Sequence, residues 1–214
     1  MFKQRNYWRV SSERPEDIYS EPIEYYTEEQ IEKYAKSKSM KKIQEELAYR
    51  IIELLRVSSG KLLDLGCGVG FTSEAYIKEG FDVMAIDLLP KMVEKAKERG
   101  IKAQVGDMRN LQEIFKKEEF DCIVSASALQ WVKFKDEIEK VAFGINYILK
   151  PSGRVVIQFY PKSKKEVLAI AKIFKKNGFE GEIIIDNPDN PLKRRVFLVF
   201  NKHQNNKNFI NNEG

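Results

Sequence analysis

From residue 61 onward, short apolar runs alternate with stretches in which apolar residues recur at helical spacing. Short apolar runs bounded by glycine or proline are typical of buried strands, and the helical spacing is typical of amphipathic helices. Because the two patterns take turns, we predict an α/β domain with a mostly parallel sheet and helices on both faces. The predicted strands are Lys61–Leu65, Asp82–Asp87, Ile101–Val105, Phe120–Ser125, Arg154–Phe159, Glu182–Asp186 and Arg195–Phe200.

The residues at the ends of the predicted helices support this division. A helix is predicted over Phe71–Glu79, and Pro90 opens another that Gly100 closes, which is the usual placement of proline and glycine. Further helices are predicted near 111–117, 138–149 and 167–174. No helix separates the last two strands, so we expect them to form an antiparallel hairpin.

The N-terminal part of the chain lacks this alternation. Residues 1–22 have mixed charge, and Pro15 and Pro22 are expected to break any helix there. Both a flexible arm and an ordered lid fit this composition. Thr27 and Gln30 match the capping box, in which each side chain bonds the other's backbone amide, so a helix is predicted to start there.

The chain therefore divides into three parts within one domain. Apolar residues at helical spacing between Met40 and Leu54 predict a second N-terminal helix. The polar residues after the last strand predict a disordered end. The boundaries are 1–58 for the N-terminal arm and helices, 59–200 for the core, and 201–214 for a flexible polar tail.

A glycine-rich turn follows the first strand of the core. The stretch Leu62–Phe71 reads Leu-Leu-Asp-Leu-Gly-Cys-Gly-Val-Gly-Phe, which predicts strand, tight turn and helix. Gly66, Gly68 and Gly70 allow strained backbone dihedrals and leave room for a ligand to approach. The helix start also presents amide groups and a positive dipole end to an anionic group. Gly-x-Gly by itself is a weak signal, because many α/β proteins need glycine at that corner.

Two acidic residues at strand ends make the signal more specific. Asp87 ends the second strand, 21 positions after Gly66, where a carboxylate accepts hydrogen bonds from ribose hydroxyls in dinucleotide-binding folds. Asp107 ends the third strand. An NAD-binding domain is the alternative, but the glycines are spaced Gly-x-Gly-x-Gly and not Gly-x-Gly-x-x-Gly. We therefore predict that the turn holds S-adenosylmethionine and that the chain is a methyltransferase.

Seven strands with a closing hairpin resemble the class I methyltransferases over residues 60–200. The resemblance implies the strand order 3-2-1-4-5-7-6. It implies that Asp107 receives the adenine amino group, that Leu88 and Met108 flank the ring, and that Ser125 lies beneath the sulfonium. Asp64 is expected to help fix the turn and the methionine ammonium, and Tyr34 to close over the methionine end. The expected cofactor-binding residues are Tyr34, Asp64, Gly66, Cys67, Gly68, Gly70, Asp87, Leu88, Asp107, Met108 and Ser125.

Composition excludes some classes of function. The net charge of +5 and pI of 9.0 are compatible with RNA binding but not diagnostic. Cys67 and Cys122 are not in a metal-ligand spacing, and His203, the only histidine, falls in the polar tail, so we expect no metal site and no histidine-based triad. No apolar run is long enough to span a membrane, and the N-terminus has no apolar signal core, so a cytoplasmic protein is expected.

Further motifs lie on both sides of the glycine turn. They are Arg14-Pro15-Glu16, Tyr25-Tyr26, Tyr34-x-x-Ser37, Ile43-Gln44, Gln158-Phe159-Tyr160-Pro161-Lys162, Gly178-Phe179-x-Gly181, Asp186-x-Pro188 and Val196-Phe197-Leu198-Val199. Together they resemble the small-subunit ribosomal RNA (guanine-N7) methyltransferases of eukaryotes, and the chain is identified as an archaeal relative. The resemblance extends to about residue 200. The chain departs from the eukaryotic family in its short Asn-rich tail, where that family has a long basic extension.

Guanine N7 suits the residues present, because its in-plane lone pair carries no proton and its methylation needs no general base. Catalysis would depend on alignment and on exclusion of water. The major groove of an RNA helix is too deep and narrow to reach N7, so the base must be extruded or lie in a loop. Trp131 and Tyr160 are the expected stacking residues, and Gln130 and Gln158 the expected partners of the guanine edge. Core packing is an equally good interpretation of Trp131.

Two partners are expected. Lysines 164, 165, 172, 175 and 176, with Lys193, Arg194 and Arg195, offer contacts to RNA phosphates, although a solvated charged surface is the simpler interpretation. The family resemblance implies a small zinc-binding activator subunit along the edge strand, where Ile101, Ala103 and Val105 would otherwise be bare.

Two other functions remain open. Leu129-Gln130-Trp131 also occurs in small-molecule methyltransferases, for which a closed apolar cavity would argue. The third hypothesis is a ribosome-assembly factor in which the fold serves binding more than catalysis.

Overall fold

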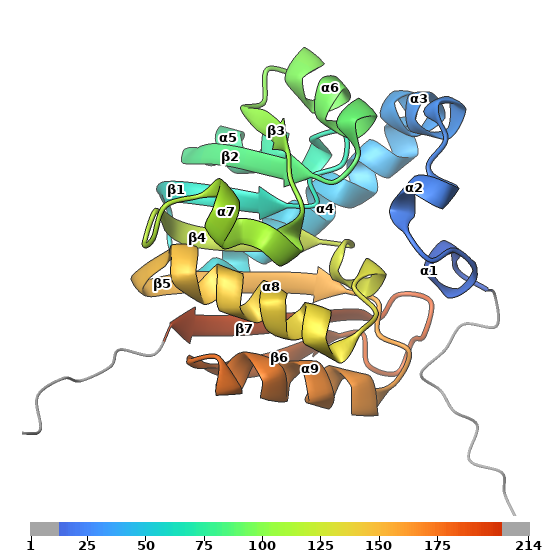
Figure 1. Cartoon of the computed structure of the whole chain (residues 1–214). Helices are drawn as coiled ribbons and strands as arrows, with labels where there is room; N and C mark the ends of the chain where they lie inside the picture. Colours follow the sequence, from blue (N-terminus) through green and yellow to red (C-terminus); the bar gives the residue numbers. More distant parts are fainter. Residues whose placement is uncertain (1–12, 203–214) are drawn as a thin grey trace, which may run out of the picture.

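The computed structural model describes residues 13–202, which form one seven-stranded sheet in the order β3-β2-β1-β4-β5-β7-β6 (Figure 1). Strands β1 to β5 are parallel, and β7 pairs antiparallel with both β5 and β6. This confirms the predicted strand order and the closing hairpin. The strands are β1 (Gly60–Leu65), β2 (Phe81–Asp87), β3 (Ala103–Val105), β4 (Phe120–Ala126), β5 (Leu149–Phe159), β6 (Phe179–Asp186) and β7 (Arg195–Lys202).

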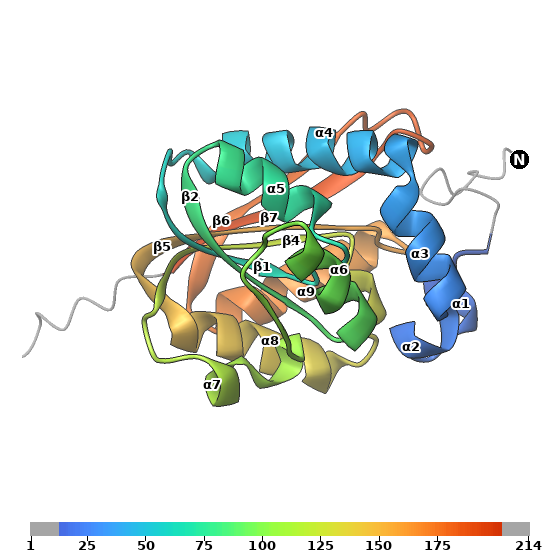
Figure 2. The same ribbon diagram turned by 90° about the horizontal axis from the view of Figure 1, so that it is seen from above.

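Helices cover both faces of the sheet (Figure 2). One face carries α4 (Lys38–Leu55), α5 (Phe71–Lys78) and α6 (Pro90–Glu98), and the other α7 (Leu111–Ile114), α8 (Lys135–Ile148) and α9 (Lys164–Lys176). Consecutive strand residues serve opposite layers: Leu62 packs with α4 and α5, whereas Leu63 packs with α8 and α9. Because side chains alternate across a strand, a run buried on both sides must be apolar almost throughout.

Several strand boundaries differ from the predicted ones. Strand β5 begins at Leu149, which was predicted to end a helix, because Leu149 pairs with Phe120. A register shift between this pair and the next one, Cys122 with Arg154, accommodates the extra residues of β5. Strand β3 is shorter than predicted, since the amide of Ile101 bonds the carbonyl of Ala96 at the end of α6. Strand β7 continues to Lys202, so the predicted tail loses its first two residues; positions 203–214 lie outside the described residues.

The described part of the N-terminal segment is folded. Helices α1 (Pro15–Ile18) and α2 (Pro22–Tyr25) lie beside the carboxyl ends of the parallel strands (Figure 1), followed by α3 (Glu28–Lys36). The expectation that Pro15 and Pro22 break helices was wrong: each occupies a first helical position, where proline's missing N–H costs nothing. Thr27 and Gln30 form the predicted capping box. Residues 13–26, which contain α1 and α2, are called the lid below.

Within residues 13–202, no helix is both long and apolar enough to cross a bilayer, and no three potential ligands are grouped to hold a metal. Cys67 and Cys122 are buried free thiols. His203 lies outside the described residues.

Candidate functional site

The glycine turn between β1 and α5 holds backbone conformations that favour glycine. Gly66 and Gly68 have φ of 72° and 54°, in the left-handed region. A Cβ on Gly66 would lie 2.4 Å from the Cβ of Ala128, whereas one on Gly68 would meet nothing within 4 Å. Gly66 is therefore required by both conformation and space, and Gly68 by conformation alone. Between them, the Cys67 side chain is buried against α6, and burial raises the pKa of its thiol.

Asp87, the last residue of β2, is bonded to this turn. Its carboxylate accepts hydrogen bonds from the amides of Gly68 at 2.8 Å and Leu89 at 3.0 Å. Burial raises the pKa of the carboxyl, and the two amides oppose the rise. A carboxylate offers about four acceptor positions. Two are used here, so Asp87 keeps capacity for donors on a ligand in the cavity that it lines.

Asp64 lies under the turn, fully buried in the middle of the sheet and away from the cavity lining. Its Oδ2 accepts hydrogen bonds from the hydroxyls of Thr72 at 2.8 Å and Ser73 at 2.7 Å, on the first turn of α5. Oδ1 has no partner among the described residues, and burial raises the pKa to about 6. The geometry therefore joins Asp64 to the helix that follows the turn and does not bring it to the cavity wall.

Asp107, after β3, is paired with a residue that sequence reasoning missed. Its carboxylate accepts hydrogen bonds from the amide of Arg109 at 2.8 Å and from Nε at 2.9 Å. Nη1 of the same arginine contacts Glu137 of α8 at 2.7 Å and Glu21 of the lid at 3.4 Å. Arg109 thus connects the loop after β3, α8 and the lid. A charged residue two positions after Asp107 was the only sequence signal.

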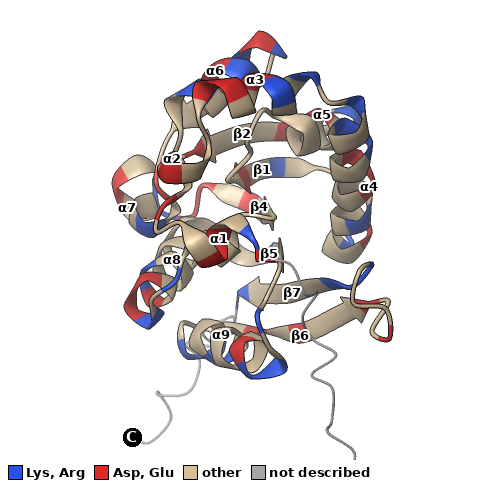
Figure 3. Ribbon diagram, turned by 90° about the vertical axis from the view of Figure 1, so that its right-hand side faces the viewer, with Lys and Arg blue, Asp and Glu red and all other residues tan. Residues whose placement is uncertain are grey.

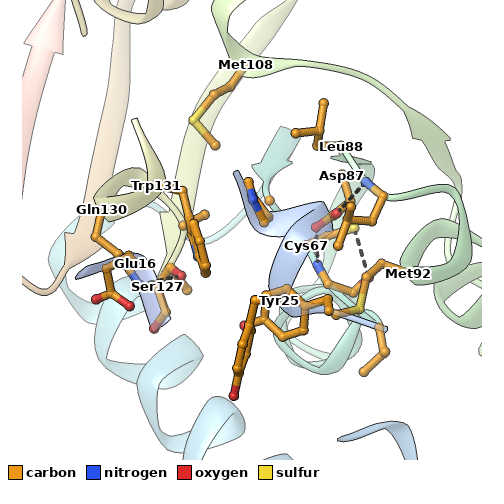
Figure 4. A pocket seen from close by; sticks show the side chains of 18 of the residues that line it. Glu16, Tyr25, Cys67, Asp87, Leu88, Met92, Met108, Ser127, Gln130 and Trp131 are labelled. Atoms are coloured by element: carbon orange, nitrogen blue, oxygen red, sulfur yellow. Dashed lines mark hydrogen bonds between the residues drawn. The ribbon is translucent and has the colours of Figure 1, made fainter. Parts of the chain in front are cut away.

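A cavity of about 580 Å³ opens above these loops, and its two halves differ (Figure 4). We call the side with Asp87, Leu88, Cys67 and Met92 the cofactor half, and the side with Ser127, Gln130, Trp131 and Glu16 the substrate half. Figure 4 shows these two groups facing each other across the cavity, and Met108 also lines it. The volume lies within the roughly 300–1,000 Å³ usual for small-molecule sites.

Aromatic residues of the lid and of α3 line the cavity together with Trp131. The half-buried Trp131 ring packs 6.3 Å from Tyr25 and 6.1 Å from Tyr26, measured between ring centroids. Tyr34 packs against Phe71 at 5.6 Å, and burial raises its pKa to about 12. Burial raises the pKa of Tyr26 as well. Both hydroxyls therefore remain neutral at physiological pH.

Two of the four expected substrate residues, Trp131 and Gln130, lie in the substrate half, and Tyr160 also lines the cavity. Nε2 of Gln130 donates to the carbonyl of Ser127 at 2.8 Å, and its buried Oε1 has no partner among residues 13–202. Tyr160 is about one-third exposed. An acceptor and two rings are thus available to a planar base.

Gln158 is not at the cavity, and the expectation that it contacts guanine does not match its position. Its side chain is fully buried; Oε1 accepts from the amide of Ser127 at 3.0 Å and from its hydroxyl at 2.9 Å. Ser127 has a φ of 57°, so Gln158 holds a strained loop from below. Ser125 also lies outside the lining, because its hydroxyl donates to the carbonyl of Leu65. Gly70 is likewise outside the lining and caps the N-terminus of α5.

The family model described as "Methyltransferase domain" matches residues 63–157. A solved protein from Pyrococcus horikoshii superposes with a TM-score of 0.65 at 21% identity, over 78% of this chain and 93% of that one. Magnesium protoporphyrin IX methyltransferase from Synechocystis, solved with bound S-adenosylmethionine, gives 0.59 at 18% identity, over 76% and 79%. The fold and the glycine turn next to Asp87 define a class I methyltransferase, and S-adenosylmethionine is its cofactor.

Curated relatives narrow the class. The chain is 31% identical to the 18S rRNA (guanine-N7)-methyltransferase of Schizosaccharomyces pombe over 87% of this chain and 73% of that protein. It is 31% identical to the enzyme of the same name from Bos taurus over 86% and 70%. The chain belongs to the 18S rRNA (guanine-N7)-methyltransferase family. The archaeal origin expected from the sequence stays a prediction.

Proposed function

We propose that this enzyme methylates N7 of a guanine in small-subunit ribosomal RNA. The observation that carries the proposal is the 31% identity over 87% of the chain to a relative named for that reaction. This match extends beyond residues 63–157, the part that resembles methyltransferases in general. It therefore includes segments outside the common cofactor-binding core.

The cofactor half fits S-adenosylmethionine. The glycines of the Gly66-Cys67-Gly68 turn bring bare backbone to the cavity wall beside the Cys67 side chain, and Asp87 offers acceptors for ribose hydroxyls. Leu88 and Met108 line the space expected for the adenine ring. Asp107 and Tyr34 also line the cavity, although Asp107 is already paired with Arg109. We assign Asp64, Gly70 and Ser125 to shaping the turn and the strand ends, since they lie outside the lining.

Transfer to N7 requires positioning and no base. The bound cofactor supplies an electrophilic methyl group on a sulfonium. Trp131 and Tyr160 offer stacking surfaces, and Oε1 of Gln130 offers an unused acceptor. Tyr25 and Tyr26 of the lid pack against Trp131 and limit the access of water to this part of the cavity.

Exposed lysines on α9 support an RNA substrate over a free metabolite. The helix begins on the side of the lid and runs away from it (Figure 1), and Figure 3 shows its Lys and Arg positions in blue. Five of them, Lys164, Lys165, Lys172, Lys175 and Lys176, are exposed. Arg195 is paired with Glu46 at 3.8 Å and is less available than the α9 lysines. Exposed lysines on one helix can neutralise successive phosphates, which makes binding fall steeply with salt. We also propose that the protein acts in the cytoplasm, as the sequence predicted.

The free edge of β3 is where a small zinc-binding activator subunit would add a strand. Only Val105 of the three expected apolar residues is exposed; Ile101 and Ala103 are buried against α6. The expectation of a bare apolar border was therefore wrong for two residues. The unpaired backbone of β3 still offers the hydrogen bonds of strand addition. A chain that is monomeric and fully active by itself would rule out a required subunit.

The test is mass mapping of small-subunit RNA from a strain that lacks the gene. A missing 7-methylguanine, restored by the wild-type chain, is expected. An intact modification pattern would remove the proposal and favour a small-molecule substrate. Complementation with Asp87→Ala separates catalysis from a scaffold role, with the exposed Asp82→Ala as the matched control. If Asp87→Ala restores subunit maturation without the methyl group, the fold also serves assembly.

A further inference from the structure

The lid places a buried carboxylate in the substrate half of the cavity. Glu16, in α1, is only 5% exposed and lines the cavity (Figure 4). Acidic side chains are rarely buried unless they are paired. Oε1 of Glu16 lies 3.3 Å from Nη1 of Arg14, so the acid has one partial partner within the lid. Figure 4 shows it beside Ser127, on the side of the cavity that carries Gln130 and Trp131.

Arg14 brings an unused donor to the same place. Its Nη1 donates to the backbone carbonyl of Tyr160 at 2.6 Å, which fixes the guanidinium across the end of β5. Its Nη2 is buried and has no hydrogen-bond partner among the described residues, although the side chain lines the cavity. A buried donor left without an acceptor costs folding free energy. Such a donor is therefore expected to meet an acceptor on a ligand.

We propose that Arg14 and Glu16 read the Watson–Crick edge of the target guanine, an inference that rests on the proposed function. That edge presents one acceptor, O6, followed by the donors N1–H and N2–H. Arg14 supplies the donor for O6, and the two oxygens of Glu16 supply acceptors for the two N–H groups. Adenine presents a donor in place of O6 and an acceptor in place of N1–H. It would therefore set a donor against Arg14 and an acceptor against Glu16.

The arrangement also orients the reacting atom. N7 lies on the side of the purine opposite N1 and N2. A base held at Glu16 by its N1 and N2 groups therefore turns N7 away from the lid acid. In Figure 4, Glu16 lies across the cavity from Asp87 and Cys67. The edge of the base that carries N7 therefore faces the cofactor half. Recognition and alignment are then achieved by the same two side chains.

The test compares guanine with inosine, which keeps O6, N1–H and N7 but lacks the N2 amino group. The RNA is a synthetic fragment around the mapped target, made once with guanine and once with inosine there. The full chain, with its activator if one is required, is assayed for kcat/KM of methyl transfer to both. The wild type is expected to prefer guanine by at least about tenfold, because a charged acceptor loses its donor on inosine.

Glu16→Ala is expected to lower kcat/KM for guanine by about tenfold to a hundredfold and to bring the guanine-to-inosine ratio close to one. Glu16→Gln keeps the shape of the side chain and is expected to narrow the ratio as well, which covers the case in which the alanine variant folds poorly. Calorimetry with S-adenosylmethionine should give wild-type affinity for both variants. The matched control is Glu13→Ala, an exposed acid outside the cavity lining, with unchanged kinetics expected.

The outcomes separate the two proposals. If the wild type forms no 7-methylguanine in the RNA, the proposed function fails and the inference fails with it. If the wild type methylates guanine but both Glu16 variants keep its guanine preference, only the inference is overturned. A purely structural role for Glu16 would lower both rates and leave their ratio unchanged.

Discussion

The carboxylate of Asp87 accepts a 2.8 Å hydrogen bond from the amide of Gly68, which joins the end of β2 to the glycine turn after β1. The two strands are neighbours in the sheet, with Leu65 paired to Ile86. The turn and the carboxylate that the sequence singled out separately therefore form one structural unit. A ligand that bonds Asp87 also touches the backbone that Asp87 holds in place.

Asp87→Ala should weaken the binding of S-adenosylmethionine at least a hundredfold. The variant loses acceptors for the ribose and releases the amides of Gly68 and Leu89. A hydrogen bond to a charged group is worth about 1.5–3 kcal/mol, so losing the two bonds to the ribose hydroxyls predicts at least a hundredfold lower affinity. Isothermal calorimetry measures this loss, with Asp82→Ala as the control of unchanged affinity. Wild-type affinity in Asp87→Ala would show that the cofactor lies elsewhere.

Gly66→Ala should destabilise the protein more than Gly68→Ala. Both positions have positive φ, which costs a non-glycine residue about 1–2 kcal/mol. Only at Gly66 does the added Cβ also collide, at 2.4 Å from that of Ala128. Overpacking adds about 1–3 kcal/mol, so the free energies of unfolding should differ by that amount. Urea denaturation checks this, and equal losses would contradict the proposed clash.

Gln158→Leu should weaken methyl transfer more than cofactor binding. The change removes the acceptor of the Ser127 hydroxyl and one of the two acceptors of its amide, which keeps the Gln158 backbone carbonyl at 3.0 Å. The expected cost is about 0.5–1.5 kcal/mol in unfolding free energy. Ser127 lies in the substrate half, so the loop that carries Gln130 and Trp131 should shift. Steady-state kinetics and calorimetry on the same preparation separate the two effects. An equal loss of both would contradict an effect confined to the loop of the substrate half.

Arg109→Ala should loosen the lid. The guanidinium is the common partner of Asp107, Glu137 and the lid residue Glu21. Hydrogen exchange measured by mass spectrometry should become faster in peptides spanning residues 13–26, while the β1–β4 core keeps its protection. Glu21→Gln removes only the lid contact and should produce a smaller increase in the same peptides. Unchanged exchange in both variants would show that the lid is held by its aromatic contacts alone.

Asp64 should make folding stability depend on pH. Burial raises its pKa to about 6 in the folded protein, whereas an unfolded aspartate has a pKa of about 3.9. A raised folded-state pKa gives a stabilisation that is complete below about pH 4 and is lost as pH rises through about 6. Relative to Asp64→Asn, the wild type should lose roughly 3 kcal/mol of unfolding free energy over that interval. Urea titrations at several pH values test this, and parallel curves would contradict it.

The strand order, the closing hairpin and the glycine turn were predictable because local patterns encode them. Alternating strands and helices leave few topologies open, and glycine spacing marks a turn wherever it falls in the chain. The sequence also placed Asp87 at a strand end beside that turn. These features depend on residues close together in sequence, where spacing and geometry are directly related.

Only the tertiary structure decided which side chains line the cavity. Gln130 follows the buried strand β4 and faces the cavity. Gln158 lies near the end of the buried strand β5 and bonds Ser127 from beneath. Burial does not distinguish a polar side chain with a core partner from one that awaits a ligand. The Arg14 contact with Tyr160 joins residues 146 positions apart, which no periodicity can indicate. The sequence determined which strand ends form the site, and long-range packing decided which side chains face into it.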